Sequence, residues 1–202
     1  VHGRLGNDGV VIVFPGHGAA RHPGDPQRGL PVPADRAPRC DLDPAVAAGQ
    51  IATGLRTSDG RRYGSDNYFT GGEVRKILQR AWRSAGDVTP IRGLGAPGDE
   101  QLYATLRAGR FRYDIPLPNG DYRVVLGFVE PSATTKVAER VFDVEANGTK
   151  VITGLDVLRE AGASRTVLTR TLRVGVSEGR LSLEFTPTTG EALVSTITIT
   201  KE

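Results

Sequence analysis

The 202-residue sequence has one cysteine, one tryptophan and no methionine. A single cysteine, Cys40, cannot form a disulfide within the chain, so its stability must come from a hydrophobic core, and cysteine usage does not indicate the redox compartment. No apolar run approaches the roughly 18 to 20 residues that cross a bilayer, so we expect no membrane span. The start at Val1 also lacks the charged and then apolar pattern of a signal peptide.

Residues that hold metals or carry out catalysis are also scarce. Three histidines, His2, His17 and His22, lie in the first part of the chain, but no Cys, His or carboxylate recurs at a ligand spacing. We see no phosphate-binding loop and no Ser-His-Asp set, and the segment FPGHG lacks the serine of a nucleophile elbow. The sequence therefore predicts no metal and no cofactor.

The charge is nearly balanced. Lys and Arg number 26 against 23 Asp and Glu, and the pI is about 9.2. This balance does not indicate a nucleic-acid partner. The 26 glycines and 13 prolines point to many turns, which suit short strands better than long helices.

Residues 1–50 differ in composition from the rest of the chain. Residues 10–14 form an apolar run that predicts one strand, whereas residues 15–44 are rich in Pro and Gly and cannot support helices or central strands. We interpret this stretch as an extended surface segment or as a linker from a larger protein. Residues 51–202 are then one domain.

From residue 51 onward the pattern is that of strands and turns. In YRVVLGFVE, for example, Tyr122, Val124, Leu126 and Phe128 alternate and would share one face. We predict seven strands, at residues 110–115, 121–130, 139–145, 150–153, 164–174, 179–186 and 192–200. Regular short strands with Asn-Gly turns indicate an all-β fold, a two-sheet antiparallel β-sandwich like a jelly roll.

Five residues of these strands are expected to be buried between the two sheets: Phe128, Phe142, Val144, Leu183 and Phe185. Helical signals are few. Apolar spacing suggests a helix at residues 73–82, an Asp-Glu start suggests another at 98–108, and LDVLREAG suggests a third at 155–162 that ends on Gly162.

Several motifs occur in a fixed order along residues 50 to 200. They are IATG at 51–54, YGSDNYFTGG at 63–72, LYATLRAGRFRYDIPLPNGDYRVVLGFVEP at 102–131, ERVFDVEANG at 139–148, LDVLREAG at 155–162 and EALVSTITI at 191–199. Taken together they resemble the malectin family. The resemblance implies a non-catalytic carbohydrate-binding module of the kind attached to bacterial glycoside hydrolases, secreted or at the cell surface.

The resemblance also places the ligand site in the loops at one end of the sandwich, where aromatic rings stack on sugar. Tyr68 matches a ligand-contacting tyrosine of the family, but Ala108, Ser132 and Ala133 stand where the family has aromatic rings. The candidate carbohydrate-binding residues are Asp66, Tyr68, Phe69, Trp82, Tyr103, Arg107 and Glu130. Trp82 lies in an insertion, and it either replaces a stacking ring or anchors the insertion to the core.

Three functions remain open at this point. The first is recognition of an oligosaccharide or polysaccharide, with a glucan-like ligand expected. The second is a structural or protein-interaction module that packs against a neighbouring catalytic domain, a reading favoured by the missing rings. The third is an enzyme that uses Asp66 and Glu130, since two carboxylates about 5 to 9 Å apart can cleave a glycosidic bond.

Overall fold

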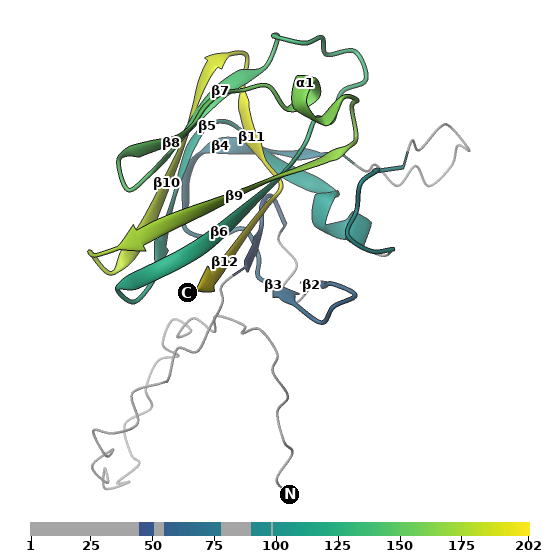
Figure 1. The fold of residues 1–202 in the computed structure, drawn as a ribbon. Coiled ribbons are helices and arrows are strands. Elements are labelled where there is room, and N and C mark those ends of the chain that lie inside the picture. The colour runs from purple at the N-terminus through teal and green to yellow at the C-terminus, as the bar shows by residue number, and fades with distance from the viewer. Residues whose placement is uncertain (1–44, 51–54, 78–89, 98) are drawn as a thin grey trace, which may run out of the picture.

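The computed structural model describes residues 45–50, 55–77, 90–97 and 99–202. Two antiparallel sheets pack face to face, and a short hairpin lies beside them (Figure 1). The four-stranded sheet has the order β1 (Ala45–Ala47), β12 (Thr196–Lys201), β6 (Gly120–Val129) and β9 (Val167–Val176). The predicted all-β sandwich is thus confirmed.

The second sheet has six strands. Its order is β11 (Ala192–Val194), β5 (Thr105–Pro116), β10 (Arg180–Thr189), β7 (Val141–Ala146) and β8 (Thr149–Leu155), and β4 (Phe69–Lys76) pairs with β5. The hairpin consists of β2 (Leu55–Arg56) and β3 (Arg62–Tyr63). The described residues also include a 3₁₀ helix, η1 (Asp99–Tyr103), and the helix α1 (Val157–Ala161).

The core lies between the two sheets and follows the alternation in the sequence. The five residues predicted to be buried, Phe128, Phe142, Val144, Leu183 and Phe185, are all fully buried. Stacked and tilted ring pairs fill the space, with centroids 4.6 Å apart for Phe111 and Phe185. This burial is the main favourable term in the stability of the domain.

The strand predicted at residues 192–200 is in fact two strands in different sheets. Ser195 divides it, so that β11 pairs with β5 in one sheet and β12 pairs with β6 in the other. The backbone of Ser195 bonds to Gly127 and to Ala48, which ties the crossing point to both β6 and the segment after β1. One continuous segment of the chain therefore contributes a strand to each of the two sheets.

Two of the three predicted helices are wrong where the structure describes them. Glu73 to Lys76 belong to β4, and of residues 98–108 only Asp99 to Tyr103 are helical, as one short 3₁₀ turn. Both segments pair with each other, since β4 runs antiparallel to residues 105–113 of β5. Pairing across the sheet outweighs local helical preference here.

The third helix is confirmed as α1. The Asp156 carboxylate accepts a hydrogen bond of 3.0 Å from the backbone N–H of Arg159, and Gly162 ends the helix in the left-handed conformation with φ 78°. These are the usual start and stop signals of a short helix. The strand predicted at residues 10–14 and the residues from 78 to 82, including Trp82, lie outside the described part of the chain.

Candidate functional site

A nearly sealed ion pair joins the segment before β4 to strand β5. The Asp66 and Arg107 side chains are 5% and 3% exposed. The Arg107 Nε donates to Asp66 Oδ2 over 3.1 Å, and Nη2 donates to the same oxygen. A charge pair so deprived of water holds only if its remaining donors are also satisfied.

Two glycines of β4 accept hydrogen bonds from the remaining donor nitrogen of Arg107. Arg107 Nη1 donates to the carbonyl oxygens of Gly71 and Gly72 over 3.0 and 3.2 Å. Both glycines have positive φ angles, 80° and 65°, at a bulge in the pairing of β4 with β5. A Cβ on Gly72 would lie 2.8 Å from the Ala108 carbonyl oxygen, so the bulge requires glycine there.

Tyr113 completes the network from the core side. Its hydroxyl donates to Asp66 Oδ1 over 2.6 Å, and its ring is fully buried. Burial, and then the neighbouring Asp66 charge, raise the pKa of Tyr113 well above its ordinary value. Both carboxylate oxygens of Asp66 are therefore bound by groups of the protein itself.

Phe69 lies over this network and remains open to solvent. The guanidinium carbon of Arg107 is 3.3 Å from the centroid of the Phe69 ring, and the residue is 42% exposed. A cation against one ring face fixes the orientation of the ring. Tyr68 differs, because it is partly buried against the core with φ 64°, and burial raises its pKa.

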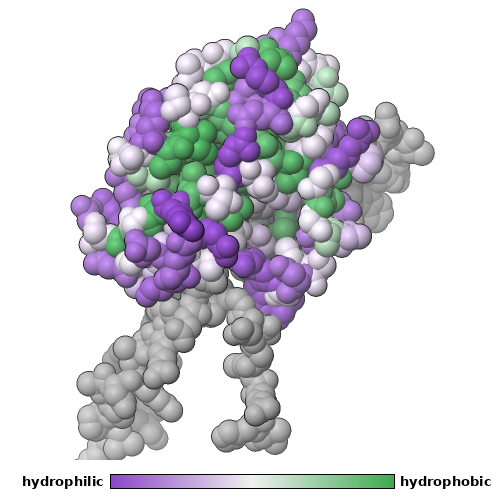
Figure 2. Space-filling model, viewed as in Figure 1, coloured by the Kyte–Doolittle hydropathy of each residue, from purple (hydrophilic) through white to green (hydrophobic). Residues whose placement is uncertain are grey.

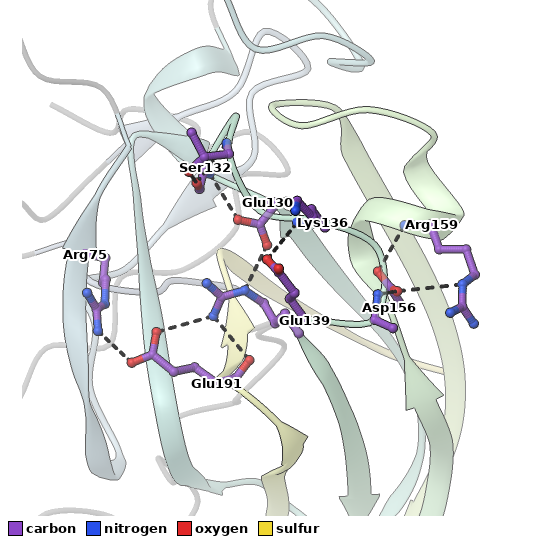
Figure 3. Close-up of polar contacts among 11 residues, drawn as sticks. Arg75, Glu130, Ser132, Lys136, Glu139, Asp156, Arg159 and Glu191 are labelled. Atoms are coloured by element: carbon purple, nitrogen blue, oxygen red, sulfur yellow. Dashed lines mark hydrogen bonds and ion pairs between the residues drawn. The ribbon is translucent and has the colours of Figure 1, made fainter.

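Glu130 lies in a separate network at the loop end of the sandwich (Figure 3). It is 1% exposed, and its carboxylate accepts from the Ser132 backbone over 3.0 Å and from Arg140 Nε over 2.8 Å. Arg140 Nη1 also contacts the Glu191 carboxylate at 3.3 Å, and Glu191 contacts Arg75 at 2.6 Å. Charges of alternating sign thus run across this end of the molecule.

The two carboxylates considered as a catalytic pair are engaged by different arginines. Asp66 is bound by Arg107 and Glu130 by Arg140. In each case the partner guanidinium and further donors occupy the carboxylate oxygens. Neither carboxylate is therefore open to a substrate, as the two carboxyl groups that cleave a glycosidic bond must be.

Tyr103 lies in a third place, a groove of about 560 Å³ on the outer face of the four-stranded sheet. Burial raises the pKa of Tyr103, whose hydroxyl is hydrogen-bonded to the Thr196 side chain. Of the predicted site residues that the structure describes, Tyr103 lines this groove and the others do not. The structure thus groups Asp66, Tyr68, Phe69 and Arg107 and leaves Glu130 and Tyr103 apart.

Sequence reasoning did not identify the threonines of this groove. The run TITIT at residues 196–200 alternates strictly, so Ile197 and Ile199 enter the core while Thr196 and Thr198 line the groove. Alternation between a β-branched apolar residue and a threonine was the signal in the sequence that could have located this polar face.

Neither a metal centre nor a membrane-spanning helix is found among the described residues. No group of three or more His, Cys, Asp or Glu side chains in this part of the chain is placed to hold a metal ion. Within the same residues, no helix has the length and apolar character needed to cross a membrane.

The malectin domain family matches residues 44–202. Malectin-B of Xenopus laevis is 34% identical over 91 residues, which are 44% of this chain and 32% of that protein. The kinesin-like protein KIN-14Q of Arabidopsis thaliana is 29% identical over 160 residues, which are 78% of this chain and 11% of that protein. The chain therefore spans a third or less of the length of these curated relatives.

Among solved structures, a Bacteroides uniformis β-glucuronidase has a similar fold. The match has a TM-score of 0.63 and 19% identity, and it covers 80% of this chain and 18% of the enzyme. At this identity the likeness shows a shared fold, in one part of a much larger protein.

Proposed function

The chain belongs to the malectin domain family, and on that premise we propose that it is a non-catalytic module that binds a glucan-like oligosaccharide or polysaccharide. Domains of this family are carbohydrate-binding or ectodomain modules. We further propose that the module is secreted or at the cell surface and acts beside a glycoside hydrolase domain. The occurrence of the fold within a β-glucuronidase supports this last point.

The observation that carries the proposal is the exposed ring of Phe69. Sugars present C–H faces that pack on flat aromatic rings, and a ring fixed in advance loses little freedom on binding. Arg107 holds the ring from below, and Asp66 neutralises the cation in turn. The buried network thus supports the binding surface and does not itself contact the ligand.

Replacement of Phe69 by Ala tests this role, with Val74→Ala as the matched control. Both residues are exposed apolar side chains of β4, at 42% and 48%. We expect Phe69→Ala to weaken retardation in affinity gels that contain soluble β-glucan, starch or xylan about tenfold, which corresponds to about 1.4 kcal/mol. Val74→Ala should change retardation less than twofold, and equal effects of the two variants would contradict the assignment.

A second candidate, the protein-interaction module, is favoured by a strip of half-buried apolar residues. Val151 and Ile152 of β8 and Leu168 and Leu172 of β9 pack on the core at the edges of the two sheets. Figure 2 shows apolar surface in the region where β8 and β9 lie in Figure 1. If wild-type protein migrates freely through every polysaccharide gel, this reading replaces carbohydrate binding.

A further inference from the structure

The groove on the outer face of the four-stranded sheet is a second surface with the features of a ligand site. Its floor comes from three adjacent strands, with Val125 of β6, Thr169 of β9, and Thr196 and Thr198 of β12. These side chains point away from the core because their neighbours in sequence point into it. The floor is therefore a row of hydroxyl and methyl groups.

The two walls of the groove come from segments far apart in the sequence. One wall is the turn of the β2–β3 hairpin. The other is formed by Gly93, Gly95 and Ala96 together with residues of η1. In Figure 1 the hairpin lies below the four-stranded sheet. The walls also contact each other, since the Ser58 backbone donates to Asp99 Oδ1 over 3.3 Å.

Two tyrosines hold the walls against the floor. The Tyr63 hydroxyl is 3.0 Å from Thr198 Oγ1, and the Tyr103 hydroxyl is hydrogen-bonded to Thr196. Both threonines belong to β12, so the opposite walls are anchored on one central strand. A groove fixed in this way exists before any ligand arrives, which lowers the entropic cost of binding.

The polar groups that line the groove suit a sugar chain. Alongside the hydroxyls there are two carboxylates, Asp59 and Asp99, and one guanidinium, Arg61. The buried Nη1 of Arg61 has no hydrogen-bond partner within the described residues. Buried donors of this kind are normally satisfied, so this atom favours an incoming acceptor such as a sugar oxygen.

The size and charge of the groove restrict the class of ligand that it can bind. Its volume, about 560 Å³, lies within the range of about 300 to 1,000 Å³ that is typical of ligand sites. Two carboxylates against one guanidinium give the lining a formal charge of −1 (1 − 2), which disfavours an acidic sugar. The same carboxylates accept hydrogen bonds well from neutral hydroxyl groups.

We propose that this groove is a second carbohydrate subsite, separate from Phe69, that takes an uncharged oligosaccharide through its hydroxyl groups. The inference rests on the proposed function. The groove would give the outer face of the four-stranded sheet a part in binding, in addition to the Phe69 surface on β4.

The test is to block the groove without touching the core. Thr169 is exposed on the groove floor, and Thr149 is an exposed strand threonine of the other sheet. We would prepare Thr169→Tyr and, as the control, Thr149→Tyr, and titrate each with maltohexaose, cellohexaose, laminarihexaose, xylohexaose and hexagalacturonate. Thermal melting of each variant shows whether the fold is kept.

We expect Thr169→Tyr to raise the Kd of the neutral hexasaccharide that binds wild type at least tenfold, and Thr149→Tyr to change it less than twofold. A smaller change, Thr169→Val, removes the hydroxyl and keeps the shape, and it should raise the Kd about threefold. Because this variant is nearly isosteric, it remains informative if the tyrosine destabilises the domain.

Three outcomes would overturn the inference. If Phe69→Ala abolishes binding while both Thr169 variants bind as wild type, the groove is not a subsite and the proposed function stands. If hexagalacturonate binds as tightly as the neutral sugars, the uncharged ligand class is wrong. If wild type binds no hexasaccharide at all, both the proposed function and the subsite fail together.

Discussion

The edge at β4 and the outer face of the four-stranded sheet hold their polar groups in opposite ways. At the edge, Asp66 and Arg107 are nearly sealed and bond to each other and to the backbone. On the sheet face, the turn of the hairpin and Thr169 are open to water. The first region uses polar groups to fix a ring, whereas the second presents them to solvent.

This difference determines what a substitution does in each region. A buried charge that loses its partner keeps its full desolvation cost, so changes at the edge should appear as losses of stability. Exposed polar groups contribute little to stability because water and salt screen them. Changes at exposed residues of the groove, such as Thr169, should therefore alter ligand binding and leave the melting temperature nearly unchanged.

The largest effect is expected from Arg107→Met, which leaves the buried Asp66 carboxylate without its charged partner. Its free energy of unfolding should fall by about 3 to 5 kcal/mol. The matched control is Arg112→Met, since Arg112 pairs with Asp114 at 48% and 27% exposure on the same strand. That change should cost no more than about 1 kcal/mol. Urea unfolding followed by fluorescence measures both, and similar losses would contradict the account of the edge.

The two regions also differ in what their tyrosine hydroxyls bind, and a second pair of variants measures this. Tyr113→Phe removes a donor to the Asp66 carboxylate and should cost about 1.5 to 3 kcal/mol, as bonds to charged groups do. Tyr63→Phe removes a bond to the neutral Thr198 hydroxyl and should cost about 0.5 to 1.5 kcal/mol. Both variants are measured in the same urea unfolding series. Equal losses of unfolding free energy would contradict the view that the hydroxyl of Tyr113 makes the stronger hydrogen bond.

The sequence predicted the sandwich because its signals are local. Alternation in β6 and β10 placed Phe128, Leu183 and Phe185 in the core. The Asn147-Gly148 pair predicted a tight turn, because these two residue types tolerate positive φ angles, and their φ angles are indeed 47° and 76°. The prediction failed at residues 73–76 and 105–108, where the predicted helices are instead two paired strands that are distant in sequence. No local pattern reports that pairing.

The candidate site shows the same limit. Asp66, Phe69 and Arg107 were each identified from the sequence, but the pair that joins Asp66 to Arg107 spans 41 positions, so spacing could not show that it is buried. The groove depends on three strands and two walls, which the fold alone brings together. The candidate residue types could thus be identified from the sequence, whereas the contacts that bury some of them and leave Phe69 exposed could not.

The smallest expected effect concerns Asp59, on the hairpin wall of the groove. Its carboxylate accepts from the Thr57 hydroxyl and, over 3.3 Å, from the Arg61 backbone N–H. These two bonds hold the pKa of Asp59 below its ordinary value of 3.8, and the bond from Thr57 has the larger effect. Because the folded-state pKa lies below the unfolded one, the stabilisation is present above pH 3.8 and is lost as the pH falls through the folded pKa.

The variant Asp59→Asn keeps an acceptor oxygen but does not titrate, so it isolates this contribution. Since Asp59 is exposed, we expect the wild type to be more stable than the variant by less than about 1 kcal/mol at pH 6. That gap should narrow as the pH is lowered from about 4 to 2, because protonation then removes the charge from the wild type as well. Urea unfolding of both proteins across this range, with the Arg61 amide followed by NMR, tests it. A gap that stays constant to pH 2 would mean that the Asp59 charge does not hold the hairpin wall.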